Sequence, residues 1–386
     1  MAKKKKEPLP SAVQAVAAPQ TGRQQRLFAL PGLSSPTRRG DLALYRMLRE
    51  TVPIIDAALM KTVRLLGSFN VFCSDKAAED ALRHFLKTVP VGSLRYGVDA
   101  FLSTYFEQLL TYGTAVGEMV VTDGRLSDLY NADLRRVALS FGRSPLDVVV
   151  SAQNESGQFL PVPFPELVLK SVHDPEPGRV YGTSVLRGLP FVSDILLTIF
   201  QTTGVNWDRL GNVRFAVTYK PQNDALDKAY AAERAQQIAQ EWSKAMRDTG
   251  AVRDFIAVGD VEVKAIGSDN QVLSSEIPVR QLLEQIVAKL GIPPFLLGLN
   301  WSSTERMSSQ QADILTSEID AYRRELEPIV LRICNTFLRL EGYDCPVQVE
   351  WEPLTLQDIT ALSQAALLDA RTEQLRKEIG ETQDDI

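Results

Sequence analysis

The 386-residue chain contains few cysteines and histidines, and this shortage excludes several kinds of site. Its three cysteines, Cys73, Cys334 and Cys345, are odd in number and widely spaced, which predicts reduced thiols in a cytosolic protein rather than a disulfide framework. Only two histidines occur, His84 and His173, and there is no CxxC pair, so a metal site rich in His or Cys is hard to build. We therefore expect no metal or other cofactor and interpret both histidines as structural.

Long hydrophobic runs and the common catalytic motifs are also missing. The longest apolar stretches, Leu282–Leu290 and Ile329–Leu340, are interrupted by charged residues and are too short to cross a bilayer. The basic start Met1–Lys6 is followed by Glu7 and prolines rather than by an apolar segment, which argues against a secretory signal. No GxGxxG, GxxxxGK[ST], GxSxG or HExxH motif is present. These absences predict no membrane partner and lower the expectation of an enzyme without eliminating it.

The composition is that of a folded chain, except for a strongly basic N-terminal segment. The chain is 45% hydrophobic and 23% charged, which excludes disorder throughout, and its length predicts about two or three modules. Residues 1–39 hold eight Lys and Arg against one acidic residue, so their net charge of +7 leaves −13 for the remainder. Because this arm lacks periodic apolar spacing, we expect it to be disordered. It is either a solvated tail or a contact to nucleic acid or an acidic partner.

Apolar periodicity predicts a mixed α+β body over residues 40–183. Helical spacing begins at Asp41 and breaks at Pro53, and two further helices are expected at Lys76–Val89 and Val98–Tyr112. Strands are expected at Asn70–Cys73, Ala115–Val121, Val148–Ala152, Phe159–Phe164 and Leu167–His173. The body ends in a joint rich in Pro and Gly, His173–Ser184.

The second half predicts a small α/β module between two helices. The flanking helices are expected at Val185–Leu210 and Glu276–Leu290. The module is expected to contain a strand at Val213–Tyr219, a helix at Leu226–Asp248 and a hairpin of Phe255–Val258 with Val261–Ile266. Next come a helix from about Ser308 to Leu340 that should bend near Pro328, a strand at Val347–Trp351 and a helix at Leu356–Lys377.

Four segments resemble the portal proteins of tailed bacteriophages of the HK97/SPP1 type, and the last three stand in the order of that family. They are Tyr112–Glu118 (YGTAVGE), Tyr181–Leu186 (YGTSVL), Leu290–Gly298 (LGIPPFLLG) and the proline-bent helix that follows. The resemblance covers residues 40 to 370 and implies an α+β, mainly helical portal fold assembled as a ring. Its implied parts are a wing (40–183), stem helix 1 (184–212), a clip (213–266), stem helix 2 (267–291), a tunnel loop region (292–307), a long kinked wing helix and strand (308–353), and a short crown with an acidic tail (354–386).

The resemblance also implies a function and a set of partners. Portal proteins form the ring, dodecameric as a rule, through which double-stranded DNA passes at one vertex of the capsid. The implied roles are genome packaging by terminase, head–tail joining and DNA ejection. The implied partners are further copies of the chain, the DNA, the terminase, a head–tail adaptor, and the major capsid protein or scaffold. The implied location is the portal vertex of the virion, after assembly in the host cytoplasm.

Candidate site residues follow from the same resemblance, and each set has a plainer structural interpretation. The tunnel loop residues facing DNA would be Asn300, Trp301, Ser302, Ser303, Thr304, Glu305 and Arg306. The stem residues would be Gly182, Ser184, Thr198, Gln201, Thr202 and Asn206, and those for clip docking Lys220, Lys228, Lys244, Arg247 and Arg253. Alternatively, the loop hydroxyls cap the next helix, Trp301 anchors the loop by packing, Gly182 supplies a positive φ, Ser184 caps the first stem helix, and the clip cations are solvated surface.

Charge in the first stem helix suits a conduit. Cations lining a channel would bind DNA through its phosphates, whereas this helix balances Arg187 and Arg209 against Asp194 and Asp208. Its polar surface is expected to be neutral, and its apolar stripe is expected to be covered by a neighbouring subunit in a ring. The residues expected in that stripe are Phe191, Ile195, Leu196, Ile199 and Phe200, with Ser193 on the polar side.

Two other classes of function remain open. A nucleic-acid-processing enzyme of virion assembly would need carboxylates that hold metal ions, and the pairs Asp123/Asp128 and Asp254/Asp260 are the candidates, although no motif accompanies them. A scaffold or interaction protein of the capsid is the third possibility, and the symmetry of the oligomer distinguishes it from a portal.

Overall fold

The computed structural model describes the backbone of residues 38–144, 146–211, 214–219, 261–266, 275–299 and 305–354, with five positions between 230 and 240. Side chains are described in the same ranges except at 38–40, 208–219, 261–266 and 305–309. Residues 1–37, most of the predicted clip helix, the predicted strand Phe255–Val258 and the predicted crown helix Leu356–Lys377 lie outside the described residues. The structure therefore bears on the body, the two flanking helices and one strand pair.

Four helices open the body, and local signals in the sequence set their ends. They are α1 (Arg38–Thr51), α2 (Pro53–Leu65), α3 (Lys76–Thr88) and α4 (Val98–Tyr112). Pro53 lies in the first turn of α2, where its missing N–H costs nothing, and the Asp75 side chain caps α3 by accepting a hydrogen bond from the amide of Ala77. Gly113, with φ of 70°, ends α4. The predicted helices are confirmed, and α1 begins two residues inside the predicted arm.

Two sheets complete the first part of the body. The larger has the strand order β3-β2-β5-β4-β9, in which β4 is antiparallel to both neighbours and β2 runs parallel to β5. The smaller has the order β6-β7-β8. The bounds are β2 (Pro90–Val91), β3 (Arg95–Tyr96), β4 (Thr114–Thr122), β5 (Arg125–Asn131), β6 (Val137–Phe141), β7 (Val148–Gln153), β8 (Phe159–Pro161) and β9 (Val168–Val172), with a 3-10 turn, η1 (Pro165–Leu167), before β9.

The predicted strands are present, but the prediction of this region was incomplete. Strands β2, β3, β5 and β6 were not predicted, and β8 stops at Pro161 instead of reaching Phe164. The early end of β8 is explained by the prolines at 161 and 163, which have no N–H group to donate to a neighbouring strand. Strand β5 begins after an Asp123-Gly124 turn in which Asp123 has φ of 52° and Gly124 has φ of 76°. That hairpin signal links β4 to β5.

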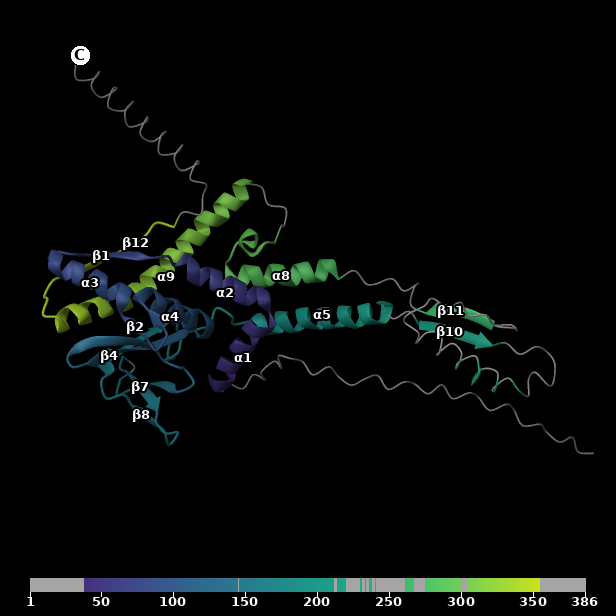
Figure 1. Ribbon diagram of the computed structural model, residues 1–386, viewed down its shortest axis with the longest axis horizontal. Coiled ribbons are helices and arrows are strands. Elements are labelled where there is room, and N and C mark those ends of the chain that lie inside the picture. The colour runs from purple at the N-terminus through teal and green to yellow at the C-terminus, as the bar shows by residue number, and fades with distance from the viewer. Residues whose placement is uncertain are drawn as a thin grey trace, which may run out of the picture.

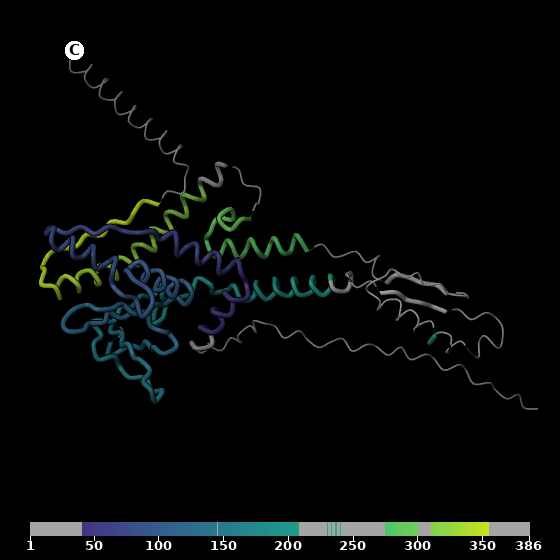
Figure 2. Tube along the Cα trace, viewed as in Figure 1, coloured from purple at the N-terminus to yellow at the C-terminus, as the bar shows by residue number. Residues whose placement is uncertain are grey.

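Helix α9 (Glu305–Leu340) and strand β12 (Val347–Trp351) close the body from the C-terminal side. Strand β12 pairs antiparallel with β1 (Phe69–Cys73), so segments from opposite ends of the chain share one two-stranded sheet. Pro328 lies inside α9, and Figure 2 shows the end of the helix running at an angle to its start. The helix begins at Glu305, three residues before the predicted Ser308.

The core lies around α4. Phe101, Tyr105 and Phe106 of this helix are fully buried, and they pack between the larger sheet on one side and α2 and α9 on the other. Apolar residues of α9, such as Ile329 and Ile333, belong to the same cluster. One continuous core therefore unites the N-terminal helices, the sheet and the C-terminal helix.

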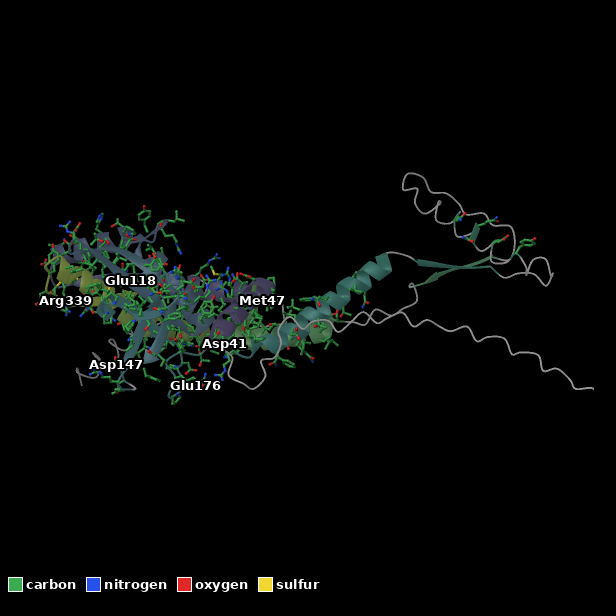
Figure 3. The ribbon with its side chains drawn as sticks, turned by 90° about the horizontal axis from the view of Figure 1, so that it is seen from below. Asp41, Met47, Glu118, Asp147, Glu176 and Arg339 are labelled. Atoms are coloured by element: carbon green, nitrogen blue, oxygen red, sulfur yellow. The ribbon has the colours of Figure 1, made fainter. Side chains whose placement is uncertain are left out.

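Two helices extend from this body. Helices α5 (Leu189–Gly211) and α8 (Glu276–Leu290) pack side by side and point away from the sheets (Figure 1). Figure 3 shows Arg339, near the end of α9, at the opposite end of the body from α5. Helix α8 has the predicted bounds and ends at Gly291, with φ of 67°. Helix α5 begins four residues later than predicted, because Val185–Gly188 forms a turn in which Gly188 has φ of 91°.

The segment between these helices contains one described strand pair. Strand β10 (Arg214–Tyr219) pairs antiparallel with β11 (Val261–Ile266), with Arg214 opposite Ile266 and Tyr219 opposite Val261. The sequence predicted β11 in a hairpin with Phe255–Val258, whereas its partner among the described residues is β10. In the described part of the chain, no helix is long and apolar enough to span a membrane.

Candidate functional site

The joint that leads into α5 is built on two glycines in contact. Gly182 lies so close to the main chain of Gly113 and His173 that a Cβ there would overlap their atoms, and a Cβ on Gly113 would lie 2.5 Å from the carbonyl carbon of Thr183. The amide of His173 donates to the carbonyl oxygen of Gly113 at 2.9 Å, and the amide of Thr183 donates to that of His173 at 2.7 Å. Gly182 does not have a positive φ, so the expectation of a left-handed conformation was wrong. The position requires space instead.

Ser184 fastens the same joint to the end of α4. Its buried hydroxyl donates to the carbonyl oxygen of Thr111 at 2.6 Å and accepts from the amide of Leu186 at 3.0 Å. Thr111 lies in the last turn of α4, where carbonyl oxygens lack helical partners. Ser184 was expected to cap the stem helix, but it caps the turn Val185–Gly188 before α5. Both Gly182 and Ser184 therefore lie at the root of the helix pair and outside α5 itself.

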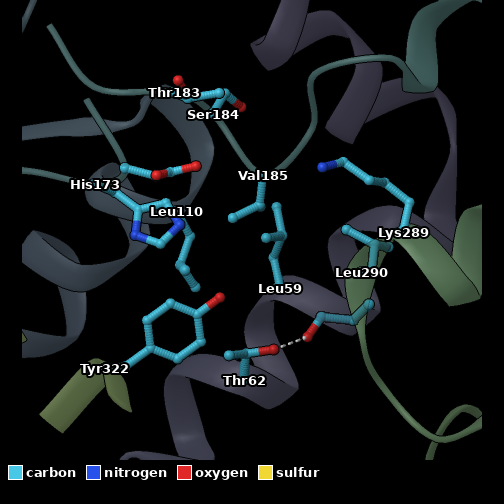
Figure 4. A pocket seen from close by; sticks show the side chains of 12 residues that line it. Leu59, Thr62, Leu110, His173, Thr183, Ser184, Val185, Lys289, Leu290 and Tyr322 are labelled. Carbon is cyan, nitrogen blue, oxygen red and sulfur yellow. Dashed lines mark hydrogen bonds between the residues drawn. The ribbon is translucent and has the colours of Figure 1, made fainter. Parts of the chain in front are cut away.

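A cavity of about 190 Å³ lies between this joint, the body and the root of α8 (Figure 4). His173, Tyr322 and Lys289 line it from β9's end, α9 and α8 respectively. The Nδ1 atom of His173 lies 3.0 Å from Oε2 of Glu325, and its ring packs against Tyr322. Burial, together with Glu318 and Glu325, raises the pKa of Tyr322 to about 12, so its phenol stays protonated at neutral pH. His173 thus connects the end of β9 to α9 through Glu325.

Helix α5 buries only part of its predicted apolar stripe on the single chain. Ser193 and Leu196 are buried at 0% and 1% exposure, whereas Phe191, Ile195 and Phe200 are exposed at 51%, 37% and 50%. The predicted assignment of Ser193 to the polar surface was wrong, because its side chain is fully buried. The large apolar side chains of α5 are therefore left open on the single chain.

Two of the candidate polar residues of α5 lie on the same helical face as Phe191 and Ile195, the exposed apolar root of the helix, but farther from the body. Thr198 and Thr202 are exposed and are spaced from Phe191 and Ile195 by helical steps of seven, and Val205, seven residues after Thr198, is also exposed, so beyond Ile195 this face mixes neutral polar and apolar side chains. The hydroxyl of Thr198 donates to the carbonyl oxygen of Asp194, and that of Thr202 to that of Thr198, each at 2.8 Å. Both hydroxyl protons are thus used within the helix. Gln201 is exposed and Asn206 is half-buried.

Positive charge is scarce on this helix. Among the described side chains of α5, residues 189–207, Asp194 carries the only charge. Arg187, just before the helix, is paired with Glu176 at 2.5 Å, and Glu176 also contacts Arg179 at 3.0 Å. The hydrogen bond and charge of Arg187 lower the pKa of Glu176, so this carboxylate stays ionised and offsets the nearby cations. The described part of the face presents no cation to a passing anion.

The expected tunnel loop is described only at its two ends. After α8, a 3-10 turn, η2 (Pro294–Leu297), ends at Gly298 with φ of 75°. Leu296 and Leu297 pack against a cluster that includes Ile292 and Ile319, which fixes this end of the loop on the body. Asn300, Trp301, Ser302, Ser303 and Thr304 lie outside the described residues. The backbone of Glu305 and Arg306 forms the first turn of α9, so these two residues belong to the helix and not to the predicted loop.

The remaining candidates are not brought together by the described structure. The clip residues Lys220, Lys228, Lys244, Arg247 and Arg253 lie outside the described residues, as do Asp254 and Asp260. Asp123 forms the β4–β5 turn and Asp128 lies on β5. Across the described ranges, no three His, Cys, Asp or Glu side chains are grouped so that they could hold a metal ion.

Comparison with known proteins identifies the fold. No protein-family model and no curated protein sequence matches the chain. A chain in the neck of a native gene transfer agent (GTA) particle, computed with C12 symmetry, is similar with a TM-score of 0.60 and 17% identity, covering 86% of this chain and 89% of that one. A chain from the virion of the native GTA particle gives a TM-score of 0.59 and 15% identity, covering 90% of each chain.

A more distant similarity is to the crystal structure of an HK97-family phage portal protein from Corynebacterium diphtheriae. Its TM-score is 0.42 and its identity 14%, covering 86% of this chain and 97% of that one. The chain has the fold of the GTA neck chains, and the α+β, mainly helical class predicted from the sequence is confirmed.

Proposed function

We propose that this chain is a portal protein of a phage-like particle, a ring-forming subunit at the capsid vertex whose central channel conducts double-stranded DNA. The observation that carries the proposal is the pair of helices α5 and α8 extending from a body, in a chain whose fold is similar to that of chains from the neck and the virion of a GTA particle. In this role the chain passes DNA inward during packaging by a terminase and outward during ejection. It also contacts a head–tail adaptor and the major capsid protein or scaffold. We place it in the virion after assembly in the host cytoplasm.

The exposed apolar root of α5 supports assembly with further copies. Phe191 and Ile195 are large and open on the single chain, and burying them against a neighbour would be favourable by roughly 1.5–3 kcal/mol for each fully covered side chain. Closed rings use such head-to-tail contacts, in which each surface meets a different surface of the next copy. The similar GTA neck was computed with C12 symmetry, and we propose a dodecamer for this chain.

The outer half of the same face supports a channel wall that releases DNA. Lys and Arg contacts to phosphates supply most of the non-specific affinity for DNA, and the described face of α5 has none. Thr198 and Thr202 add no free hydroxyl proton, because both donate to carbonyl oxygens of their own helix. We propose that Thr198, Gln201, Thr202 and Asn206 face the channel.

Two further assignments belong to the proposal and rest on the sequence alone. The loop 300–304, which connects the turn ending at Gly298 to α9, faces DNA. The clip cations at 220, 228, 244, 247 and 253 dock the terminase and later the adaptor. The alternative functions are a nucleic-acid-processing enzyme and a capsid scaffold protein without a channel.

Electron microscopy of the purified full-length chain tests the proposal. We expect rings with a central hole and a mass by light scattering of about twelve copies. The variant Ile195→Asp should prevent ring formation while leaving the circular dichroism spectrum unchanged, since Ile195 is exposed on the single chain. Leu160→Asp is the matched control, because Leu160 is 52% exposed on β8 and lies away from α5.

The opposing results are equally distinct. A wild-type chain that stays monomeric or forms a dimer without a hole at high concentration would contradict the proposal and favour a scaffold role. Steady cleavage of DNA or hydrolysis of ATP with magnesium, lost on substitution of Asp123, Asp128, Asp254 or Asp260, would favour the enzyme.

A further inference from the structure

The three cysteines, far apart in the sequence, meet at one end of the body. Cys73 is the last residue of β1, and Cys345 lies two residues before the first residue of β12. Because Cys73 pairs with Val347 across the β1–β12 sheet, the strand register brings Cys345 beside the end of β1. Cys334 lies beneath them on α9, in the same apolar cluster.

Two of these thiols lie near each other and are not fully buried. Cys345 precedes by two residues the strand residue Val347 that pairs with Cys73, and the neighbouring Cys345 thiol contributes to the raised pKa of Cys73; both residues are half-buried. Cys334 is fully buried at 0% exposure. A small oxidant can therefore reach the first pair but not the third thiol, and a disulfide needs its two cysteines to be adjacent before it forms.

We infer that Cys73 and Cys345 are a redox-sensitive pair that closes into a disulfide when the folded chain meets a small-molecule disulfide such as oxidised glutathione. The bond would join β1 to the segment entering β12 and so fasten the two-stranded sheet that unites the two ends of the described chain. Residues 74–344 would lie within the closed loop. This inference does not depend on the proposed function.

The exchange balances without any further reactant. One protein thiolate attacks a sulfur atom of oxidised glutathione and forms a mixed disulfide, and the first glutathione leaves as a thiolate that takes up a proton. The second protein thiolate attacks the protein sulfur of the mixed disulfide, and the second glutathione leaves in the same way. Two protein S–H bonds are lost, one S–S bond forms, and one molecule of oxidised glutathione is reduced to two of glutathione.

The surroundings of Cys73 set the rate of this exchange. Burial, followed by the neighbouring Cys345 thiol, raises the pKa of Cys73 to about 11. Since the thiolate is the reactive form, little of it exists at neutral pH, and exchange should be slow there and faster as the solution becomes alkaline. Closure by oxidised glutathione is therefore expected to need prolonged exposure at neutral pH.

The test uses the full-length chain incubated with oxidised glutathione at about pH 8. After unfolding in an alkylating agent, we expect the count of free thiols to fall from three to one, with a Cys73–Cys345 peptide in the mass map. The melting temperature should rise by about 5 °C or more, because the bond closes a long loop in the unfolded chain. The Cys334→Ala variant should still form the bond, whereas Cys345→Ser should lose both the linked peptide and the gain in melting temperature.

Three results would overturn the inference. The first is a folded chain that keeps all three thiols free after equilibration with the oxidant. The second is a linked peptide that contains Cys334. The third is a disulfide between two chains, seen as a dimer on a non-reducing gel. Should Cys345→Ser fail to fold, Cys73→Ser replaces it with the same expected outcome.

Discussion

Arg323 of α9 donates two hydrogen bonds to the main-chain carbonyl oxygen of Leu66, at 3.0 Å from Nε and 2.8 Å from Nη2. Leu66 caps the C-terminus of α2, where carbonyl oxygens have no helical partner. The guanidinium is buried and lies over the ring of Trp351 on β12, 5.4 Å from its centroid. One cation therefore ties together an N-terminal helix, a C-terminal helix and a C-terminal strand.

Replacing Arg323 by Met should destabilise the chain by about 3 kcal/mol. The change removes both hydrogen bonds and leaves the buried carbonyl of Leu66 without a donor, in addition to the loss of the contact with Trp351. The free energy of unfolding in urea measures it. Arg324→Met is the control, since Arg324 is the next residue on α9 and is exposed, and it should change stability by less than about 0.5 kcal/mol. Equal effects of the two substitutions would contradict the capping role.

Replacing Gly182 by Ala should disrupt the joint that leads into α5. The added methyl group would overlap the carbonyl oxygen of Gly113 and the main chain of His173, none of which can move without breaking the hydrogen bonds of the joint. We expect a loss of about 3 kcal/mol in the free energy of unfolding. Gly204→Ala should have the opposite effect on the free energy of unfolding. Gly204 lies inside α5 with open space around it, so Ala should stabilise the chain by about 0.5–1 kcal/mol. A tolerated Gly182→Ala would contradict the steric argument.

The sequence predicted the elements with strong local signals and missed what depends on long-range contact. Helices α4 and α8 and strand β12 have the predicted bounds, since each has a clear apolar period and a firm stop such as Gly113 or Gly291. Strands β5 and β6 were missed, because their burial comes from neighbouring strands more than from their own alternation. The start of α5 was placed too early, since Val185–Gly188 has apolar spacing but turns at Gly188.

Contacts between distant segments could not be read from spacing alone. The motifs at Tyr112 and Tyr181 share the letters YGT, and the structure places their glycines, Gly113 and Gly182, against each other. Both motifs were recognisable in the sequence, but nothing in their spacing predicted that they contact each other. In the same way, the wide spacing of the cysteines predicted reduced thiols and gave no sign that the β1–β12 register brings Cys73 and Cys345 near each other. In both cases the residue types were evident from the sequence, whereas the residues that they contact depend on the tertiary structure.

The free energy of unfolding should fall at alkaline pH, and ionisation of Tyr322 should contribute to this fall. Its pKa is about 12 in the folded chain, against about 10 for an unfolded tyrosine, so the folded state holds this proton while the unfolded state releases it. Unfolding is therefore favoured progressively as the pH rises from about 10 to about 12, by up to roughly 2 kcal/mol from this group. Tyr322→Phe should make the fall shallower, as measured by urea midpoints across this range.

Tyr96→Phe provides the control for the alkaline measurement, because Tyr96 is 69% exposed on β3. We expect its urea midpoints to follow those of the wild-type chain at every pH. An unchanged slope in Tyr322→Phe would mean that other buried groups, such as Cys334 with a pKa raised by burial to about 12, dominate the alkaline loss.

On the proposed channel wall, a cation added to the outer half of α5 should make the ring retain double-stranded DNA. Thr202→Lys replaces an exposed neutral side chain, and in a ring it adds one positive charge for every copy at the same height of the channel. We expect rings that retain double-stranded DNA at low salt, with an affinity that falls steeply as salt rises, because each phosphate contact releases a condensed counterion. Leu160→Lys adds the same charge on β8 and should raise the affinity far less. Rings of Thr202→Lys that bind DNA no better than those of Leu160→Lys would place Thr202 away from the channel, since a cation on the channel wall acts on the DNA from every subunit at once.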